Sequence, residues 1–170
     1  MAFVRSQIGL VQQEPFLFNG TVRENIIYGN LDATQKDIDG VAIAARAHEF
    51  ILDLPEKYET WIGERGVKLS VGQKQRIAIA RVLLKDPPIV VFDEATSNID
   101  TETEVKIREA LEILTQDRTT IIIAHRLTTL QQVGRILVLE NGQIMEEGTH
   151  ESLLARGGVY SGLYKAQFQI

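Results

Sequence analysis

The sequence predicts an α/β fold with a parallel sheet in its core. Short apolar runs at Ile8–Val11, Ile89–Phe92 and Thr120–Ala124 are typical of buried strands. Amphipathic, helix-like stretches separate these runs, as in folds that alternate strands and helices. Asp93 and Glu94 follow the central run, where open α/β sheets bind their ligands. The carboxyl ends of the strands are therefore the first place to expect a functional site.

Composition restricts the class of protein. With 170 residues, 44% hydrophobic and 24% charged, the chain suits one soluble globular domain. The net charge of −5 and the lack of a basic block argue against a nucleic-acid-binding surface. The absence of cysteine excludes disulfides and thiolate metal sites within this sequence. No apolar run approaches the roughly 18 residues that a membrane-spanning helix needs, and we expect no targeting segment at the N-terminus.

The N-terminal third combines a strand, polar loops and helices. The first strand ends at Gln12, and Gly20 with Thr21 opens a short helix for which Thr21 is the expected N-cap. Residues Ala33–Ala47 predict an amphipathic helix. A loop follows at Tyr58–Gly66, with two glycines and a Glu-Arg pair that by itself suggests only a solvated turn.

The segment Leu69–Asp100 is the most informative part of the chain. Ser70 is the expected N-cap of a helix over Val71–Lys85, and Gly72 would let the backbone approach a ligand closely. The start of that helix offers unpaired N–H groups and a positive dipole end, which suit phosphate oxygens. On the same helix, Arg76 is expected either to support this loop or to form a surface salt bridge.

Asp93 and Glu94 can divide one reaction between them. The first carboxylate can hold Mg²⁺, and the second can orient or deprotonate a water molecule. The alternative for an isolated Asp-Glu pair is that both acids cap the following helix at its positive end. The LSVGQ motif before the pair and the SNID motif after it favour the chemical interpretation.

The C-terminal part predicts further regular elements. A helix follows Asp100, with Thr101 as a candidate cap and Glu104 in the capping-box position. His125 stands after the third strand, where a lone histidine is most often a structural hydrogen-bonding group. Asn141-Gly142 predicts a hairpin. Helices are expected at His150–Ala155 and in the last fourteen residues.

The motifs LSVGQ, VVFDEATS and SNID, in this order, resemble the signature loop, Walker B strand and D-loop of ATP-binding cassette (ABC) ATPases. IGLVQQEPFLFNGTVRENI resembles the Q-loop region of that family, and AHRLTT its switch histidine. TWIGERG resembles the segment that precedes the signature in exporter-type cassettes. The sequence departs from the family at Val71, where a glycine is usual.

The resemblance implies ATP and Mg²⁺ as cofactors and assigns a role to individual residues. The catalytic residues would be Glu94, which would polarise the attacking water, and His125, which would contact the γ-phosphate. Asp93 and Gln13 would hold Mg²⁺, and Gln13 would also reach the water. The signature loop would contact ATP held by an opposite subunit, and Asp100 of the D-loop would reach across to that subunit. The residues implied in nucleotide binding are therefore Leu69, Ser70, Val71, Gly72, Gln73 and Asp100.

The resemblance also implies an incomplete domain. Residues 1–170 would form a partial ABC ATPase domain from the Q-loop to the C-terminus, with residues 33–86 as a helical signature subdomain. The P-loop pattern GxxxxGKS or GxxxxGKT does not occur in the sequence, so the N-terminal part of the domain is expected to be absent. Without it, the strand at Ile89–Phe92 should lose a neighbour, apolar faces should be uncovered, and the isolated chain should aggregate or dimerise.

The function implied is ATP hydrolysis that powers export across a membrane. The expected partners are a second ABC ATPase domain and a membrane-spanning transport domain, at the cytoplasmic face of the membrane and without nucleic acid. One alternative is a non-catalytic fragment that donates its signature face to a complete cassette. Another is a DNA-maintenance ABC ATPase, which the compact spacing and the TWIGERG segment disfavour.

Overall fold

The computed structural model describes residues 2–93, 100–124, 130–131 and 133–168. The chain divides into two compact units, Met1–Ile123 and Ala124–Ile170, and each is described here by itself. Among the described residues, no helix is both long and apolar enough to cross a membrane.

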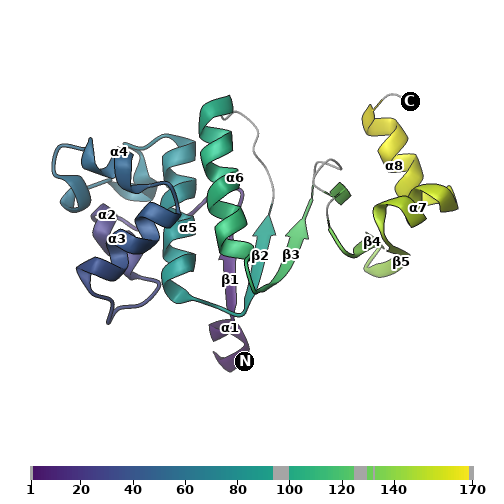
Figure 1. Ribbon diagram of the computed structural model, residues 1–170, viewed down its shortest axis with the longest axis horizontal. Coiled ribbons are helices and arrows are strands. Elements are labelled where there is room, and N and C mark those ends of the chain that lie inside the picture. The colour runs from purple at the N-terminus through teal and green to yellow at the C-terminus, as the bar shows by residue number, and fades with distance from the viewer. Residues whose placement is uncertain (1, 94–99, 125–129, 132, 169–170) are drawn as a thin grey trace. The chain divides into compact units, whose positions relative to one another are not determined.

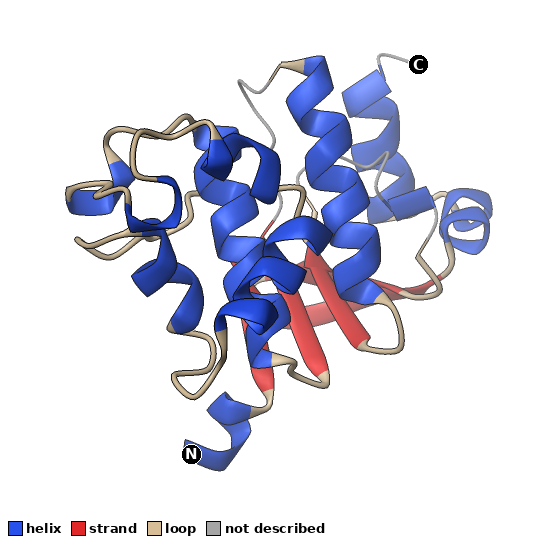
Figure 2. Ribbon diagram, turned by 60° about the vertical axis from the view of Figure 1, so that its left-hand side comes forward, coloured by secondary structure: helices blue, strands red, loops and turns tan. Residues whose placement is uncertain are grey.

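The first unit contains a three-stranded parallel sheet in the order β1-β2-β3. The strands are β1 (Ile8–Val11), β2 (Ile89–Asp93) and β3 (Thr119–Ile123), and Figure 2 shows them side by side. This confirms the predicted α/β fold with a parallel sheet. The expectation that the strand at Ile89–Phe92 lacks a neighbour is wrong, because β1 and β3 flank it on both sides.

The two faces of the sheet differ in exposure. Val11, Val90 and Phe92 are buried in the main core. Leu10 and Ile121 lie on the opposite face, in register with Val91, and each is 51% exposed. The prediction that the third strand is buried is therefore wrong: its residues alternate between exposed and half-buried, because only the face that carries Ile122 packs against the main core. The expected uncovered apolar surface is present on this face.

Two long helices lie beside the sheet (Figure 1), and both supply buried residues of the main core. Helix α5 (Val71–Lys85) has the predicted bounds. Helix α6 (Thr101–Thr115) begins one residue after Asp100, whose side chain accepts a hydrogen bond from the backbone N–H of Thr103. Asp100 is thus the N-cap, and the predicted capping role of Thr101 is wrong because Thr101 is already the first helical residue.

Short helices complete the first unit, and one of them has the cap that the sequence predicts. They are α1 (Ala2–Ser6), α2 (Val22–Ile27), α3 (Gln35–Ala44), α4 (His48–Leu52) and the 3₁₀ turns η1 (Lys57–Glu59) and η2 (Glu64–Gly66). Thr21 caps α2 in a capping box with Glu24, as predicted. The helix expected over Ala33–Ala47 is shorter, because Thr34 caps its start and Arg46 adopts a left-handed conformation after its end.

The second unit is a hairpin followed by two helices. Strands β4 (Ile136–Glu140) and β5 (Gln143–Gly148) pair antiparallel around Asn141 and Gly142. Both turn residues have positive φ, as the Asn-Gly signal predicts. Helices α7 (His150–Arg156) and α8 (Val159–Phe168) follow. A small core of Ile136, Val138, Leu153 and Tyr160 holds the unit together.

The start of α8 is fixed by the buried carboxylate of Glu146. Its two oxygens accept hydrogen bonds from the N–H groups of Val159 (3.1 Å) and Tyr160 (2.8 Å). We expect Glu146→Ala to destabilise this unit by about 1–3 kcal/mol, because the buried N–H of Tyr160 and the partly buried N–H of Val159 lose their acceptor. Hydrogen exchange of the α8 amides measures the effect, with the exposed neighbour Glu147→Ala as the matched control. Equal protection in both variants would contradict this assignment.

Candidate functional site

The segment Leu69–Gln73 is held by a complete capping box at the start of α5. The hydroxyl of Ser70 accepts from the N–H of Gln73 at 3.2 Å, and the amide oxygen of Gln73 accepts from the N–H of Ser70 at 2.9 Å. Leu69 is buried in the core, whereas Val71 is 49% exposed. The β-branched side chain at position 71 therefore points away from the core at the surface of the loop. This arrangement gives the loop a fixed shape.

Gly72 is buried and lies against α6. A Cβ atom at this position would be 2.2 Å from the methyl Cγ2 of Thr103. From the sequence, Gly72 is expected to let the backbone approach a ligand closely. In this structure the space beside Gly72 is filled by the side chain of Thr103.

Arg76 lies one helical turn after Gly72 and is buried. Its guanidinium donates to the carbonyl oxygens of Gly72 (3.2 Å) and Arg46 (2.6 Å) and lies 4.6 Å from the centre of the Phe50 ring. Burial lowers the pKa of Arg76, against the opposing effect of nearby carboxylates such as Glu49. Of the two expected roles for Arg76, these contacts favour support of the signature loop.

Asp100 is exposed at the start of α6. The pKa of Asp100 is lowered, and the largest cause is the hydrogen bond that its carboxylate accepts from the backbone N–H of Thr103. The carboxylate accepts from the Thr103 N–H at 2.9 Å. Thr103 thus contacts both Asp100 and Gly72. The structure therefore brings the N-terminus of α6, which carries Asp100, next to the N-terminus of α5, which carries the signature loop.

The loop after β1, which carries Gln13, is bonded to α5. Gln75 donates to the carbonyl oxygen of Gln12 at 3.3 Å, and Arg81 donates to that of Phe16 at 2.9 Å. Gln13 itself is half-buried between these two anchor points. Two hydrogen bonds therefore hold the loop of Gln13 against the signature helix.

Arg81 belongs to a network centred on Asn25, which is fully buried. Arg81 donates to the backbone oxygen (2.8 Å) and side-chain oxygen (2.9 Å) of Asn25. The Asn25 amide also bonds the N–H (2.8 Å) and carbonyl (3.0 Å) of Phe18. Burial lowers the pKa of Arg81 to about 10, although Tyr28 acts in the opposite direction.

Asp93 and Gln13 lie at the same edge of the sheet. Val11 pairs with Phe92, so the residues after these two strands leave the sheet together at its carboxyl end. Glu94 and His125, the two expected catalytic residues, lie outside the described residues. Among the residues that are described, no group of three or more His, Cys, Asp or Glu side chains is arranged to hold a metal ion.

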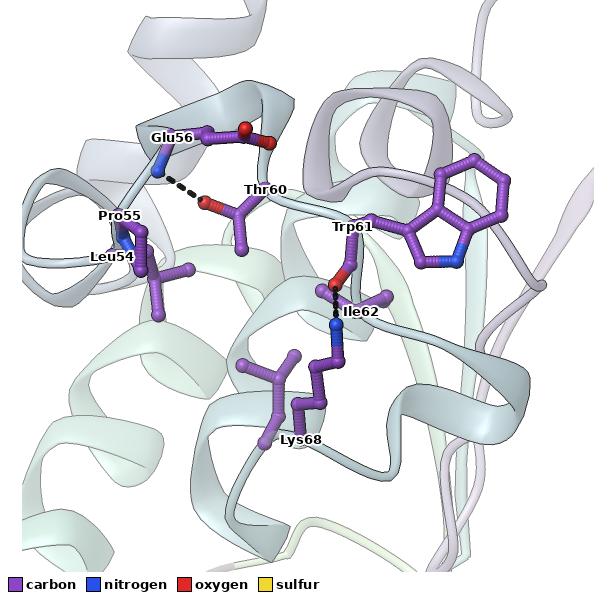
Figure 3. Close-up of a pocket in the computed structure, with 8 residues that line it drawn as sticks. Leu54, Pro55, Glu56, Thr60, Trp61, Ile62 and Lys68 are labelled. Carbon is purple, nitrogen blue, oxygen red and sulfur yellow. Dashed lines mark hydrogen bonds between the residues drawn. The ribbon is translucent and has the colours of Figure 1, made fainter.

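A pocket of about 430 Å³ lies directly before the signature loop (Figure 3). Its lining includes Trp61, Ile62, Lys68 and Leu69. The ammonium of Lys68 donates to the carbonyl of Trp61 at 3.1 Å, and the Trp61 ring is 49% exposed. The TWIGERG segment is thus folded against the residues that lead into Ser70.

Comparison with known proteins gives a family match over residues 1–97, more than half of the chain, to the model described as ABC transporter. The chain belongs to the ABC transporter family. The matched residues include the LSVGQ and VVFDEATS motifs.

Relatives of this ABC chain include multidrug export ATP-binding/permease proteins of Staphylococcus aureus, from a bovine strain and from strain COL. Each is 54% identical over 164 residues, covering 96% of this chain and 28% of the relative. A solved bacterial Atm1-family ABC exporter with ATP bound has a TM-score of 0.88 and 46% identity, covering 98% of this chain and 29% of that one. The chain thus spans less than a third of the length of the relatives it matches.

Sequence reasoning missed Thr103, Asn25 and the structural role of Arg81 in this ABC domain. Thr103 lies on the same stripe of α6 as the buried Ile107 and Ala110, so helical spacing would have placed it against a neighbour. For Arg81, nothing local in the sequence signals a partner 56 residues away.

Proposed function

We propose that this chain forms the signature and Walker B part of an exporter-type ABC ATPase, in which ATP hydrolysis powers export across a membrane. The observation that carries the proposal is the capped loop Leu69–Gln73 at the N-terminus of a fifteen-residue helix. Such a terminus favours phosphate through its N–H groups and its dipole. The likeness to a solved ABC exporter with ATP bound supports ATP as the ligand.

The residues at the sheet edge suit Mg²⁺. Asp93 offers carboxylate oxygens and Gln13 an amide oxygen, which are hard ligands of the kind that Mg²⁺ prefers. Mg²⁺ is commonly held by one or two carboxylates together with substrate phosphates, so these two donors suffice on the protein side. When bound, the ion neutralises charge on the phosphates.

Each remaining site residue has a distinct role in this proposal. Glu94 follows Asp93 and would polarise the attacking water, while His125 would hydrogen-bond the γ-phosphate. Ser70, Gly72 and Gln73 would contact ATP held by a second ABC ATPase domain, and Asp100 would reach across to that domain. Leu69 anchors this loop in the core, and the exposed Val71 would face the partner.

The proposal places the domain at the cytoplasmic face of a membrane, bound to a membrane-spanning transport domain. Phe16 and Phe18 form an edge-to-face pair at a centroid distance of 5.3 Å, and Phe18 contacts Tyr28 at 4.4 Å. All three rings are partly exposed beside the loop of Gln13, and this favours an apolar partner there. Residues 1–170 would be a partial ABC ATPase domain, with 33–86 as its helical signature subdomain.

We predict that the 170-residue chain alone binds Mg-ATP more weakly than micromolar and hydrolyses it negligibly. The reason is that its sequence lacks the P-loop pattern, whose Lys and N–H groups supply most of the grip on the β- and γ-phosphates. Isothermal titration of the chain and of the complete polypeptide tests this. Micromolar binding by a monomer of the isolated chain would contradict it.

The lack of a P-loop pattern also motivates one alternative, a non-catalytic chain that donates its signature face to a complete cassette. Titrating the chain into an intact cassette separates the two functions. A change in the cassette's turnover at saturation, lost with Ser70→Ala, would support the alternative. Unchanged turnover at saturation would leave the ATPase proposal as the better account.

A further inference from the structure

Gly72, the glycine of the signature loop, packs tightly against another helix of the same chain. Gly72 lies in the first turn of α5 without a positive φ, so its backbone conformation is open to any residue. Glycine in a helix costs up to about 1 kcal/mol relative to alanine. The structure offers a packing reason for it, since a Cβ at this position would lie 2.2 Å from Cγ2 and 3.5 Å from Cβ of Thr103.

Thr103 contacts the starts of two helices at once. Its methyl group lies over Gly72, two residues after the N-cap Ser70 of α5. Its N–H donates to the carboxylate of Asp100, the N-cap of α6, at 2.9 Å. One residue therefore links the signature cap to the Asp100 cap.

We propose that Thr103 is a positioning residue that fixes the spacing between Ser70 and Asp100. This inference rests on the proposed function, in which both caps meet the second ABC ATPase domain around one ATP. The methyl group sets how closely α5 approaches α6, and the N–H orients Asp100. A change at Thr103 therefore displaces one cap relative to the other without touching nucleotide.

The contact is tested by a double-mutant cycle in the complete polypeptide. Gly72→Ala should lower the apparent Tm by about 2–6 °C, because the new methyl collides with Thr103. Thr103→Ala removes Cγ2, so the loss caused by Gly72→Ala should largely disappear in the Thr103→Ala background. The same loss from Gly72→Ala in both backgrounds would overturn the contact.

The positioning role is tested by two conservative variants with opposite chemistry. Thr103→Ser keeps the hydroxyl and removes the methyl, whereas Thr103→Val keeps the methyl and removes the hydroxyl. We expect Thr103→Ser to lower kcat for ATP hydrolysis by roughly tenfold while KM for ATP stays within about twofold, because misplaced caps weaken the transition state rather than nucleotide binding. Thr103→Val keeps both the methyl over Gly72 and the N–H that bonds Asp100, so it should lower kcat less than Thr103→Ser does.

A matched control is Thr115→Ser, at the far end of α6, where the hydroxyl bonds the Glu112 carbonyl. It should leave both kcat and KM at wild-type values. Wild-type kcat in Thr103→Ser, in a protein that hydrolyses ATP normally, would overturn the positioning role alone. A complete wild-type polypeptide that hydrolyses no ATP would refute the proposed function and the positioning role with it, whatever the result of the thermal cycle.

Discussion

Replacing Arg81 with alanine is expected to lower the free energy of unfolding by about 3 kcal/mol or more. The guanidinium supplies hydrogen bonds to the carbonyl of Phe16 and to both oxygens of Asn25, and its loss removes all three bonds, although the side-chain oxygen of Asn25 still accepts from the Phe18 N–H. It also lies 5.3 Å from the centre of the Phe18 ring, so packing is lost together with charge. Urea denaturation of the purified protein measures the change.

The matched control is Arg23→Ala on α2, whose guanidinium bonds the side chain of Gln35 at the surface. It should cost less than about 0.5 kcal/mol. The Phe18 amide, which donates to Asn25, should exchange its hydrogen faster in Arg81→Ala and not in Arg23→Ala. If the two variants are equally stable, Arg81 does not hold the loop of Gln13.

Replacing Glu94 with glutamine is expected to lower ATP turnover of the complete polypeptide by roughly 10²–10⁴-fold. Glutamine keeps the size of the side chain but cannot accept a proton from the attacking water. Nucleotide binding should persist, so ATP-bound dimers should accumulate. Phosphate release measures the first effect and size-exclusion chromatography with Mg-ATP the second.

Glu112→Gln provides the control for loss of one carboxylate, because Glu112 lies exposed on α6. It should hydrolyse ATP at the wild-type rate. Unchanged turnover in Glu94→Gln would refute the assigned role of Glu94. A loss of nucleotide binding would show that this carboxylate contributes to binding ATP rather than to the chemical step.

Local chemistry explains why much of the fold was predictable. The strands β1 and β2 follow from short apolar runs, and α5 from the N-cap Ser70 with Gln73 three residues later. Each of these signals is complete within a few residues. The prediction that Thr101 caps α6 failed because Asp, like Thr, can cap a helix and only the backbone path decides which of two neighbours does so.

Contacts between distant segments were not predictable. Thr103 and Gly72 meet only because α5 and α6 pack together, and Arg81 reaches Asn25 across 56 residues. The exposure of Ile121 likewise depends on which elements cover the sheet. For the site, the sequence placed Asp93 and Gln13 at one edge of the sheet, while the roles of Glu94 and His125 stay predictions.

The most direct test of the central claim is ATP turnover by the complete polypeptide that contains these residues, purified and reconstituted in lipid vesicles. The account predicts saturable phosphate release that requires Mg²⁺ and falls to background in Glu94→Gln. Background phosphate release from a folded protein that binds Mg-ATP would contradict it.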